Sequence, residues 1–156
     1  MSILFRLRPF AATDFPEYHR WFADPELRTT LGGVDAEWLA YVLNDTTGQE
    51  LAVCAGAGLV GVIGVTFPTD GEGCPVITNL AIKPDRRRQG IGTRALRLLT
   101  KTIPAAPGQC WTCYVALSNR AAQRFFVANQ WTRMETTDMV RYEYRVGVAD
   151  KPAPRE

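Results

Sequence analysis

The sequence predicts an α/β protein with a mixed central sheet and helices on both of its faces. Strand-like runs and amphipathic helical segments follow one another in the order β-α-α-β-β-β-α-β-α-β-β. One apolar run leads into a basic turn with two glycines, and that turn opens a helix. The chain has 156 residues, of which 46% are hydrophobic, and no internal repeat, so we expect one domain with a substantial core.

The first third of the chain supplies one strand and two helices. Residues 3–8 alternate as a half-buried strand does. Thr13 or Asp14 can cap a first helix, which Asp24-Pro25 breaks. Asp35 is the expected N-cap of a second, short helix.

The middle of the chain reads as a hairpin followed by a single strand. Residues 50–55 and 59–67 flank a turn at Gly56-Ala57-Gly58, and residues 76–82 form the next apolar run. No charged residue occurs between Leu51 and Val65, but this run contains four glycines within 15 residues. It is too short and too broken to cross a membrane, so we expect no membrane partner.

The second half supplies two helices and three strands. We place these elements at 91–102 (helix, stopped by Pro104), 109–117 (strand), a helix that Ser118 or Asn119 caps, and a closing hairpin of 131–135 and 139–148. Residues 1–150 are the expected domain, and 151–156 are the expected frayed tail.

Charge is distributed unevenly along the chain. Between Lys83 and Arg133 ten basic residues stand against one acid, Asp85, a net charge of +9. Residues 1–82 carry four arginines and ten acids, a net charge of −6. Such a distribution attracts an anionic ligand to the basic half. The net charge of the whole chain is only +2 and the arginine cluster is local, so we expect no nucleic-acid partner.

The basic turn, residues 83–92, has the features of a phosphate site. A helix that starts at Ile91 presents unpaired backbone N–H groups and the positive end of its dipole. Gly90 and Gly92 have no Cβ, so a ligand can approach the backbone closely. The turn therefore favours a phosphate or pyrophosphate, although three arginines alone are equally typical of a solvated helix end.

Two common nucleotide motifs do not fit this turn. Residues 90–95 match the dinucleotide pattern G-x-G-x-x-A, but that site needs an acid about 20 residues later. No acid occurs between Asp85 and Glu135. The phosphate-loop pattern G-x-x-x-x-G-K-[ST] is absent as well.

The four cysteines raise the question of a metal or a disulfide. Cys110 and Cys113 have CxxC spacing, but strand alternation points them to opposite faces. With one histidine in the chain, we predict no metal site. Four reduced cysteines, the other two being Cys54 and Cys74, favour a cytoplasmic protein.

Several segments together resemble the GCN5-related N-acetyltransferase (GNAT) superfamily. Residues 87–92 match its [Q/R]-x-x-G-x-[G/A] signature, and residues 79–84 resemble the strand end that precedes it. Residues 119–126 resemble the family's N-x-x-A-x-x-F-Y segment. Leu59-Val60-Gly61 is similar to the start of its hairpin, and residues 24–27 are similar to the branch with ribosomal-protein N-terminal acetyltransferases. The resemblance spans residues 3–146.

The resemblance implies a mostly antiparallel sheet of about seven strands flanked by four helices. It also implies acetyl-CoA as co-substrate and direct attack by a primary amine, without a covalent enzyme intermediate. The residues that it assigns to acetyl-CoA are Leu80, Ala81, Ile82, Arg87, Arg88, Gln89, Gly90, Ile91, Gly92, Thr93, Asn119 and Phe126.

This chain departs from the family at both usual acid–base positions. Phe126 stands where many relatives have a tyrosine, and Val76 stands where many have a glutamate. One possibility is that other side chains supply these groups, with Tyr114 placed best and Tyr142, Tyr144, Asp70, Glu72 and His19 as further candidates. The alternatives are a proton relay through water, or a non-catalytic domain that binds or senses acyl-CoA.

Fewer residues indicate where the acceptor amine would bind. In the family the first two helices flank the acceptor, so Trp21 and Trp38 are candidate pocket residues, although aromatic residues at helical spacing usually pack a core. Four acids nearby would favour a cationic amine or form a solvated surface: Asp24, Glu26, Asp35 and Glu37. We expect a monomer or a homodimer.

Overall fold

The computed structural model describes residues 4–68, 73–103 and 110–145. Seven strands form one sheet in the order β1-β2-β3-β4-β5-β7-β6. Neighbouring strands are antiparallel except β4 and β5, which are parallel. The strands are β1 (Phe5–Pro9), β2 (Gly48–Ala55), β3 (Gly58–Thr66), β4 (Val76–Ile82), β5 (Cys110–Ala116), β6 (Thr132–Glu135) and β7 (Met139–Arg145). The predicted fold class is confirmed.

The described residues contain five α-helices instead of the four expected. They are α1 (Phe15–Trp21), α2 (Pro25–Leu31), α3 (Ala36–Asn44), α4 (Ile91–Thr102) and α5 (Arg120–Ala128), with short 3-10 turns at Ala12–Asp14 and Pro84–Arg86. The additional helix is α2. Asp24 accepts a hydrogen bond from the Leu27 N–H at 3.1 Å, and Pro25 occupies the first turn. Asp24-Pro25 thus ends one helix and also starts the next, because proline is well tolerated at the first helical position.

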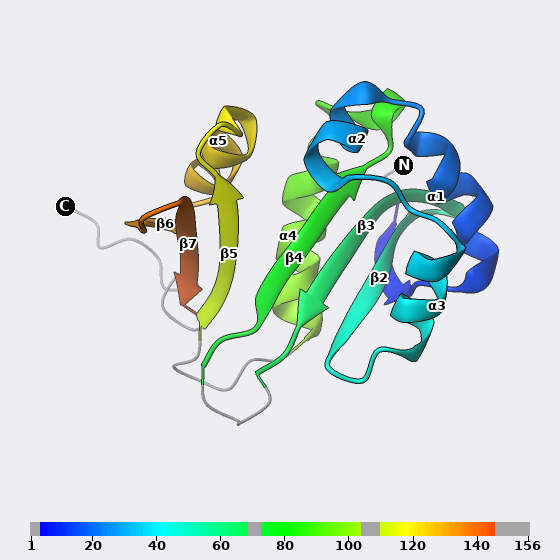
Figure 1. Ribbon diagram of the computed structural model, residues 1–156, viewed down its shortest axis with the longest axis horizontal. Coiled ribbons are helices and arrows are strands. Elements are labelled where there is room, and N and C mark those ends of the chain that lie inside the picture. The colour runs from blue at the N-terminus through cyan, green and yellow to red at the C-terminus, as the bar shows by residue number, and fades with distance from the viewer. Residues whose placement is uncertain (1–3, 69–72, 104–109, 146–156) are drawn as a thin grey trace.

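Helices lie on both faces of the sheet (Figure 1), and each face packs against them in its own hydrophobic core. The larger core joins the sheet to α4 and α5 and includes Ile63, Leu99 and Trp111. The smaller core joins the other face to α1–α3 and includes Tyr18 and Val62. Val62 and Ile63 are adjacent, so strand alternation sends their side chains into different cores.

The sheet forks between β4 and β5. These strands pair only at Val76 with Thr112 and at Ile77 with Cys113. Beyond Ile77 they separate, as the ribbon shows (Figure 1). At the same point the register of β4 against β3 shifts, since Gly64 pairs with Asn79 and Val65 with Ile77. Thr78 is therefore the extra residue of a β-bulge, which bends β4 where the fork opens.

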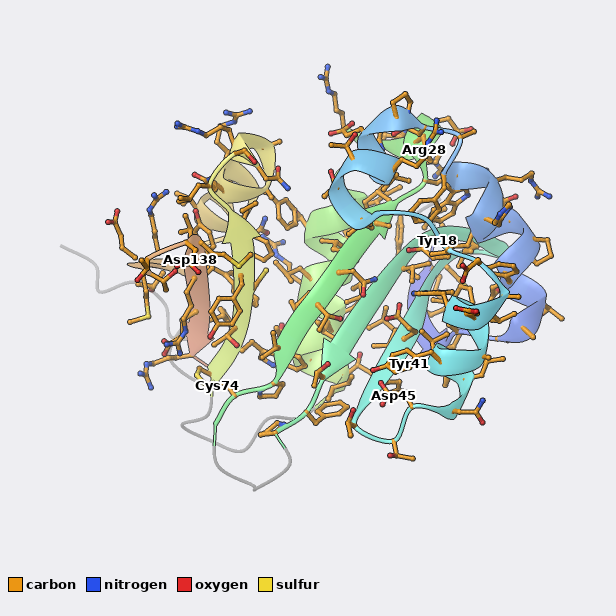
Figure 2. All side chains as sticks on the ribbon, viewed as in Figure 1. Tyr18, Arg28, Tyr41, Asp45, Cys74 and Asp138 are labelled. Carbon is orange, nitrogen blue, oxygen red and sulfur yellow. A yellow bond between two sulfur atoms is a disulfide. The ribbon has the colours of Figure 1, made fainter. Side chains whose placement is uncertain are left out.

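A disulfide lies at the closed end of the fork. Cys74, just before β4, is bonded to Cys110, the first residue of β5 (Figure 2). The expectation of four reduced cysteines is therefore wrong, because two cysteines far apart in sequence meet where β4 and β5 pair. Cys54 and Cys113 are free and buried. The cytoplasmic assignment loses its support, since disulfides are typical of oxidising compartments.

The remaining expectations for the fold concern membrane spans and the chain end. None of the helices in the described ranges is long and apolar enough to span a membrane. The predicted tail at 151–156 lies outside the described residues.

Candidate functional site

A pocket of about 980 Å³ occupies the fork between β4 and β5. Its walls come from α2, β4, the start of α4, β5 and the start of α5. Because it joins the basic turn to the opening of the fork, one ligand can contact both places. Its volume is at the upper end of the range usual for small-molecule and cofactor sites.

The start of α4 presents free N–H groups to this pocket. The first hydrogen bond of the helix runs from the Arg94 N–H to the Gly90 carbonyl, so the N–H groups of Ile91, Gly92 and Thr93 have no helical partner. Arg88 and Gly90 both have positive φ, 62° and 76°. No atom lies within 4 Å of a Cβ placed on Gly90. The turn thus leaves open space in front of N–H groups that can bind an anion.

Arg87, in contrast, is engaged with α2. Its guanidinium lies 2.8 Å from Asp24 Oδ2 and 3.0 Å from Glu26 Oε2. The hydrogen bond from Arg87 holds the pKa of Asp24 below its usual value. Arg87 therefore pairs with two of the acids expected to attract a cationic amine and holds α2 beside the basic turn. One arginine balances only one of the two carboxylates, and Glu26 also lines the pocket. Gln89 stays within the turn, where its Oε1 accepts a hydrogen bond from Arg86 Nε at 3.1 Å.

The edge of β4 that faces the fork offers backbone groups. The Lys83 N–H donates to Val60 O on β3 at 2.9 Å. Because backbone groups alternate sides along an antiparallel strand, Ala81 also faces β3, whereas Leu80 and Ile82 face the fork. Leu80 and Ile82 line the pocket, while the Ala81 side chain is buried in the smaller core. The structure thus does not bring Ala81 to the site.

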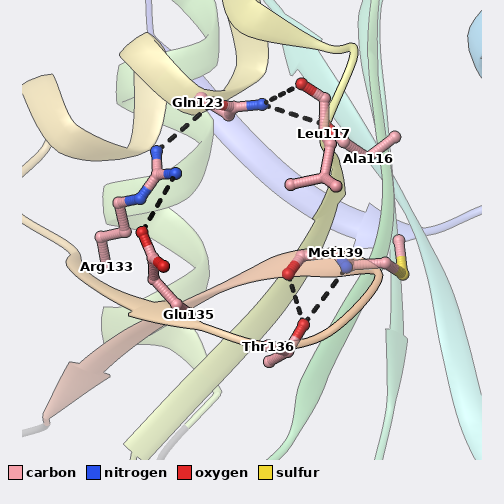
Figure 3. A network of polar contacts seen from close by, with 7 residues as sticks. All are labelled: Ala116, Leu117, Gln123, Arg133, Glu135, Thr136 and Met139. Atoms are coloured by element: carbon pink, nitrogen blue, oxygen red, sulfur yellow. Dashed lines mark hydrogen bonds and ion pairs between the residues drawn. The ribbon is translucent and has the colours of Figure 1, made fainter.

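Tyr114 and the start of α5 form the opposite wall. Tyr114 lines the pocket with 47% of its surface exposed. Asn119 caps α5, since its Oδ1 accepts a hydrogen bond from the Ala122 N–H at 3.1 Å. Gln123 holds this wall in place by donating to the carbonyls of Ala116 and Leu117 at 3.0 and 2.9 Å, and Arg133 donates to Gln123 Oε1 (Figure 3).

The other acid–base candidates that the structure describes do not line the pocket. Tyr142 is fully buried against Phe126, and Tyr144 stacks on Trp131. His19 is exposed on α1 and packs against Phe15. Asp70 and Glu72 lie outside the described residues. Of the candidates that the structure describes, Tyr114 is the one that lines the pocket.

Neither predicted acceptor tryptophan lines the pocket that the described residues form. Trp21 is 4% exposed, and its indole N–H donates to Glu17 Oε1 at 3.1 Å. Trp38 packs with Phe10 and Tyr18 around the smaller core. Both therefore serve as core residues, the alternative reading of aromatic residues at helical spacing. Phe126 is 4% exposed in the larger core, where one side of its ring borders the pocket.

Sequence reasoning missed a carboxyl group near the fork. Glu50 on β2 accepts a hydrogen bond from Asn79 Nδ2 at 3.3 Å, and Asn79 lines the pocket. Burial raises the pKa of Glu50 to about 7. The signal in the sequence was its place as the last charge before the uncharged run that begins at Leu51. Elsewhere in the described residues, no group of three or more His, Cys, Asp or Glu side chains could hold a metal.

Solved structures with the same fold include several acetyltransferases. An acetyltransferase from Thermus thermophilus is 20% identical with a TM-score of 0.76, covering 92% of this chain and 99% of that one. The ribosomal-protein-S18-alanine N-acetyltransferase of Escherichia coli is 15% identical with a TM-score of 0.64, covering 90% and 91%. The spermidine N-acetyltransferase of Vibrio cholerae, solved with CoA and spermine, is 13% identical with a TM-score of 0.69, covering 90% and 94%.

A search of curated proteins finds no match to the sequence. The model of the acetyltransferase (GNAT) family, in contrast, matches residues 7–129, which include the basic turn, the fork and all of α5. This chain therefore belongs to the acetyltransferase (GNAT) family, whose members transfer acetyl groups from acetyl-CoA to amines.

Proposed function

We propose that this protein transfers the acetyl group of acetyl-CoA to a primary amine by direct attack of that amine. One observation carries the proposal: a single pocket joins the anion-binding start of α4 to the fork between β4 and β5. Acetyl-CoA combines a charged pyrophosphate with a long arm that ends in a thioester. The residues of the pocket fit both parts, and the bound co-substrate would supply an activated acyl group.

The residues at the basic turn take the charged part of acetyl-CoA. The N–H groups of Ile91, Gly92 and Thr93 bind the pyrophosphate oxygens, and Arg88 adds positive charge. Arg87 acts by positioning α2, because its guanidinium is paired with Asp24 and Glu26. Gly90 keeps the approach to the backbone open.

The residues of the fork orient the long arm of acetyl-CoA and the thioester at its end. The backbone groups of Leu80 and Ile82 bind the extended arm as an added strand would. Asn119 Nδ2 is available for a polar group near the end of the arm, since Oδ1 caps the helix. Tyr114 presents a hydroxyl on the opposite wall and is the proposed proton donor to the departing thiolate, a role that Phe126 cannot fill.

The acceptor class is the finer part of the proposal. The Escherichia coli and Vibrio cholerae neighbours are described as acting on the alanine of a ribosomal protein and on spermidine. A peptide N-terminus and a small-molecule amine are therefore the acceptors to test first. We further propose that residues 1–150 form one domain that functions as a monomer or a homodimer.

Release of CoA thiol in the presence of acceptor amines tests the proposal. The panel consists of a peptide that begins with alanine, spermidine, an aminoglycoside and a primary arylalkylamine, with product mass as the second readout. Turnover with at least one amine supports the transferase. Binding of acetyl-CoA without turnover by any amine would instead favour the acyl-CoA-binding or sensor domain.

A further inference from the structure

Three residues lie in one row across the sheet beside the fork. Glu50 on β2 pairs with Gly64 on β3, and Gly64 pairs with Asn79 on β4. Leu51, the neighbour of Glu50, is buried in the larger core, so Glu50 points to the opposite face. On that face the absence of a side chain at Gly64 lets Glu50 and Asn79 meet.

The contacts around Gly64 show how closely these groups are packed. A Cβ on Gly64 would overlap both Asn79 Oδ1 and Glu50 Oε1, and it would lie 2.7 Å from Thr78 Oγ1. The Thr78 hydroxyl donates to Asn79 Oδ1 at 3.1 Å, and Asn79 Nδ2 donates to Glu50 Oε2 at 3.3 Å. This polar chain begins at Thr78, which lines the pocket, and ends at a carboxyl group.

The β-bulge explains why the chain of contacts reaches the fork. Thr78 is the extra residue of the bulge, so the side chains of Thr78 and Asn79 can both lie on the face that holds Glu50. Tyr114 belongs to the same face of its own strand, because its neighbours Cys113 and Val115 are buried in the larger core. On one side of the fork Thr78 and Asn79 thus line the pocket and lead to the Glu50 carboxyl group behind them, and on the other side lies the Tyr114 phenol.

The surroundings of Glu50 favour its neutral form. Burial is the main cause of its raised pKa, the carboxylate of Asp45 after α3 adds repulsion, and the Asn79 hydrogen bond partly offsets both. Burial raises the pKa of the Tyr18 phenol on α1, and the charge of Glu50 adds to that rise. Among the described residues no lysine or arginine forms an ion pair with Glu50, so it can exchange a proton near neutral pH.

We propose that Glu50 accepts the proton that the acceptor ammonium loses before it attacks the thioester. This inference rests on the proposed function. One proton of R–NH3⁺ passes to the Glu50 carboxylate through a water held by the Thr78 hydroxyl, which leaves R–NH2. The nitrogen then attacks the carbonyl carbon, a C–N bond forms and the C–S bond breaks. Tyr114 gives its proton to the departing thiolate, the nitrogen returns its second proton to the Tyr114 phenolate and keeps the third, and Glu50 later releases its proton to solvent.

Asn79 and Thr78 act as positioning residues in this account. Asn79 fixes the orientation of the Glu50 carboxyl group, and Thr78 holds the water at the mouth of the pocket. Glu50 thereby supplies, from a different strand, the carboxyl group that Val76 does not provide.

The test compares Glu50→Gln with wild type, using whichever panel amine turns over. Glutamine can still accept the hydrogen bond from Asn79 but cannot take a proton. We expect kcat/KM to fall by about 100-fold at neutral pH, with acetyl-CoA affinity unchanged. The break in the wild-type profile of kcat/KM near pH 7 should disappear in the variant, whose kcat/KM should instead rise steadily with pH up to the pKa of the amine. The difference in kcat/KM between wild type and variant should shrink at a pH where the amine is already neutral, because a free amine needs no proton acceptor.

Three further measurements separate this role from a structural one. Glu135→Gln, at an exposed carboxyl on β6, is the matched control and should keep the wild-type profile. A carbon NMR titration of the Glu50 carboxyl, in protein without acetyl-CoA, should show a midpoint near pH 7. Thr78→Val should lower kcat/KM, and Thr78→Ser should restore it.

The outcomes are distinguishable from failure of the proposed function. No turnover of any amine by folded wild type would overturn the transferase and this inference together. Turnover by wild type with an unchanged pH profile in Glu50→Gln would overturn the inference alone. A loss of kcat/KM in Glu50→Gln that is the same at every pH would also overturn the inference, because that result indicates a structural effect.

Discussion

Gly48 and Gly64 lie on neighbouring strands, yet a methyl group added to each meets different kinds of atom. At Gly48 the new Cβ would overlap the backbone oxygen of Val65. At Gly64 it would meet the ends of the Glu50, Asn79 and Thr78 side chains. Backbone cannot move without disturbing the ladder, whereas side-chain ends can rotate away. The first glycine is therefore needed for the fold and the second for the site.

This difference predicts opposite outcomes for two alanine variants. Gly48→Ala should lower the free energy of unfolding by about 3 kcal/mol, because the strand pair must separate. Gly64→Ala should cost less than about 1 kcal/mol but should scatter the polar cluster and lower kcat/KM strongly. Urea unfolding and CoA release measure the two effects. Full activity in a folded Gly64→Ala would contradict the assigned role of the cluster.

Glu50 also predicts how stability depends on pH. In the folded chain its pKa is about 7 instead of 4.5, so the unfolded chain releases this proton first as pH rises. The contribution of Glu50 to stability therefore falls between about pH 4.5 and pH 7. Glu50→Gln should be more stable than wild type above pH 7, by up to about 3 kcal/mol, and similar to it below pH 4.5. Equal stability of the variant and wild type at all pH values, measured by thermal unfolding, would mean that burial does not shift the pKa of Glu50.

The fork is produced by three local features of β4 and β5. The disulfide and the two parallel pairs hold the strands together at one end, the bulge at Thr78 bends β4, and Gln123 fixes the start of α5 on the other side. Together they hold the two walls of the pocket apart.

The disulfide should contribute to stability through the loop that it closes. Cys74 and Cys110 are 36 residues apart, for which loop-closure entropy predicts about 3–4 kcal/mol. The double variant Cys74→Ser/Cys110→Ser should therefore have a lower Tm, and a reducing agent should lower the Tm of wild type to the same extent. The reducing agent should leave the double variant unaffected. A wild-type Tm that does not respond to reduction would show that the bond adds no stability.

The elements that the sequence predicts well are those whose ends are marked by proline, glycine or capping residues. The bounds of β4 at 76–82 and of α4 at 91–102 agree with the predictions, because Pro84, Gly90 and the basic turn mark them clearly. The caps Asp35 and Asn119 were also recognisable and are confirmed. In contrast, α2 was missed because its cap, Asp24, precedes a proline that also ends α1.

Features that depend on pairing across the sheet were not predictable in the same way. Glu50 and Asn79 are 29 residues apart and meet only because Gly64 lies between them. The disulfide requires the parallel pairing of β4 and β5, and the engagement of Arg87 requires α2 to lie beside the basic turn. Their place beside the first two helices put Asp24 and Glu26 near the expected acceptor; the fold pairs both with Arg87, and Glu26 also lines the pocket.

The acidic and basic parts of the chain meet in the folded molecule. Lys83 forms an ion pair with Glu17 at 3.4 Å, and Arg87 pairs with Asp24 and Glu26. These contacts link α1 and α2 to the segment that leads into α4. Arg88 forms no ion pair within the part of the chain that the structure describes, and it lines the pocket beside Gly90. The arrangement neutralises part of the basic half and leaves positive charge where the phosphates are proposed to bind.

The measurement that tests this account most directly is calorimetric titration of acetyl-CoA into wild type and into Gly90→Trp. The indole should fill the open space in front of the α4 N–H groups while the fold, checked by circular dichroism, stays intact. We predict micromolar binding by wild type that weakens as salt is added, and its loss in the variant. Absence of binding by folded wild type, or equal binding by the variant, would contradict the assignment of the basic turn as the acetyl-CoA site.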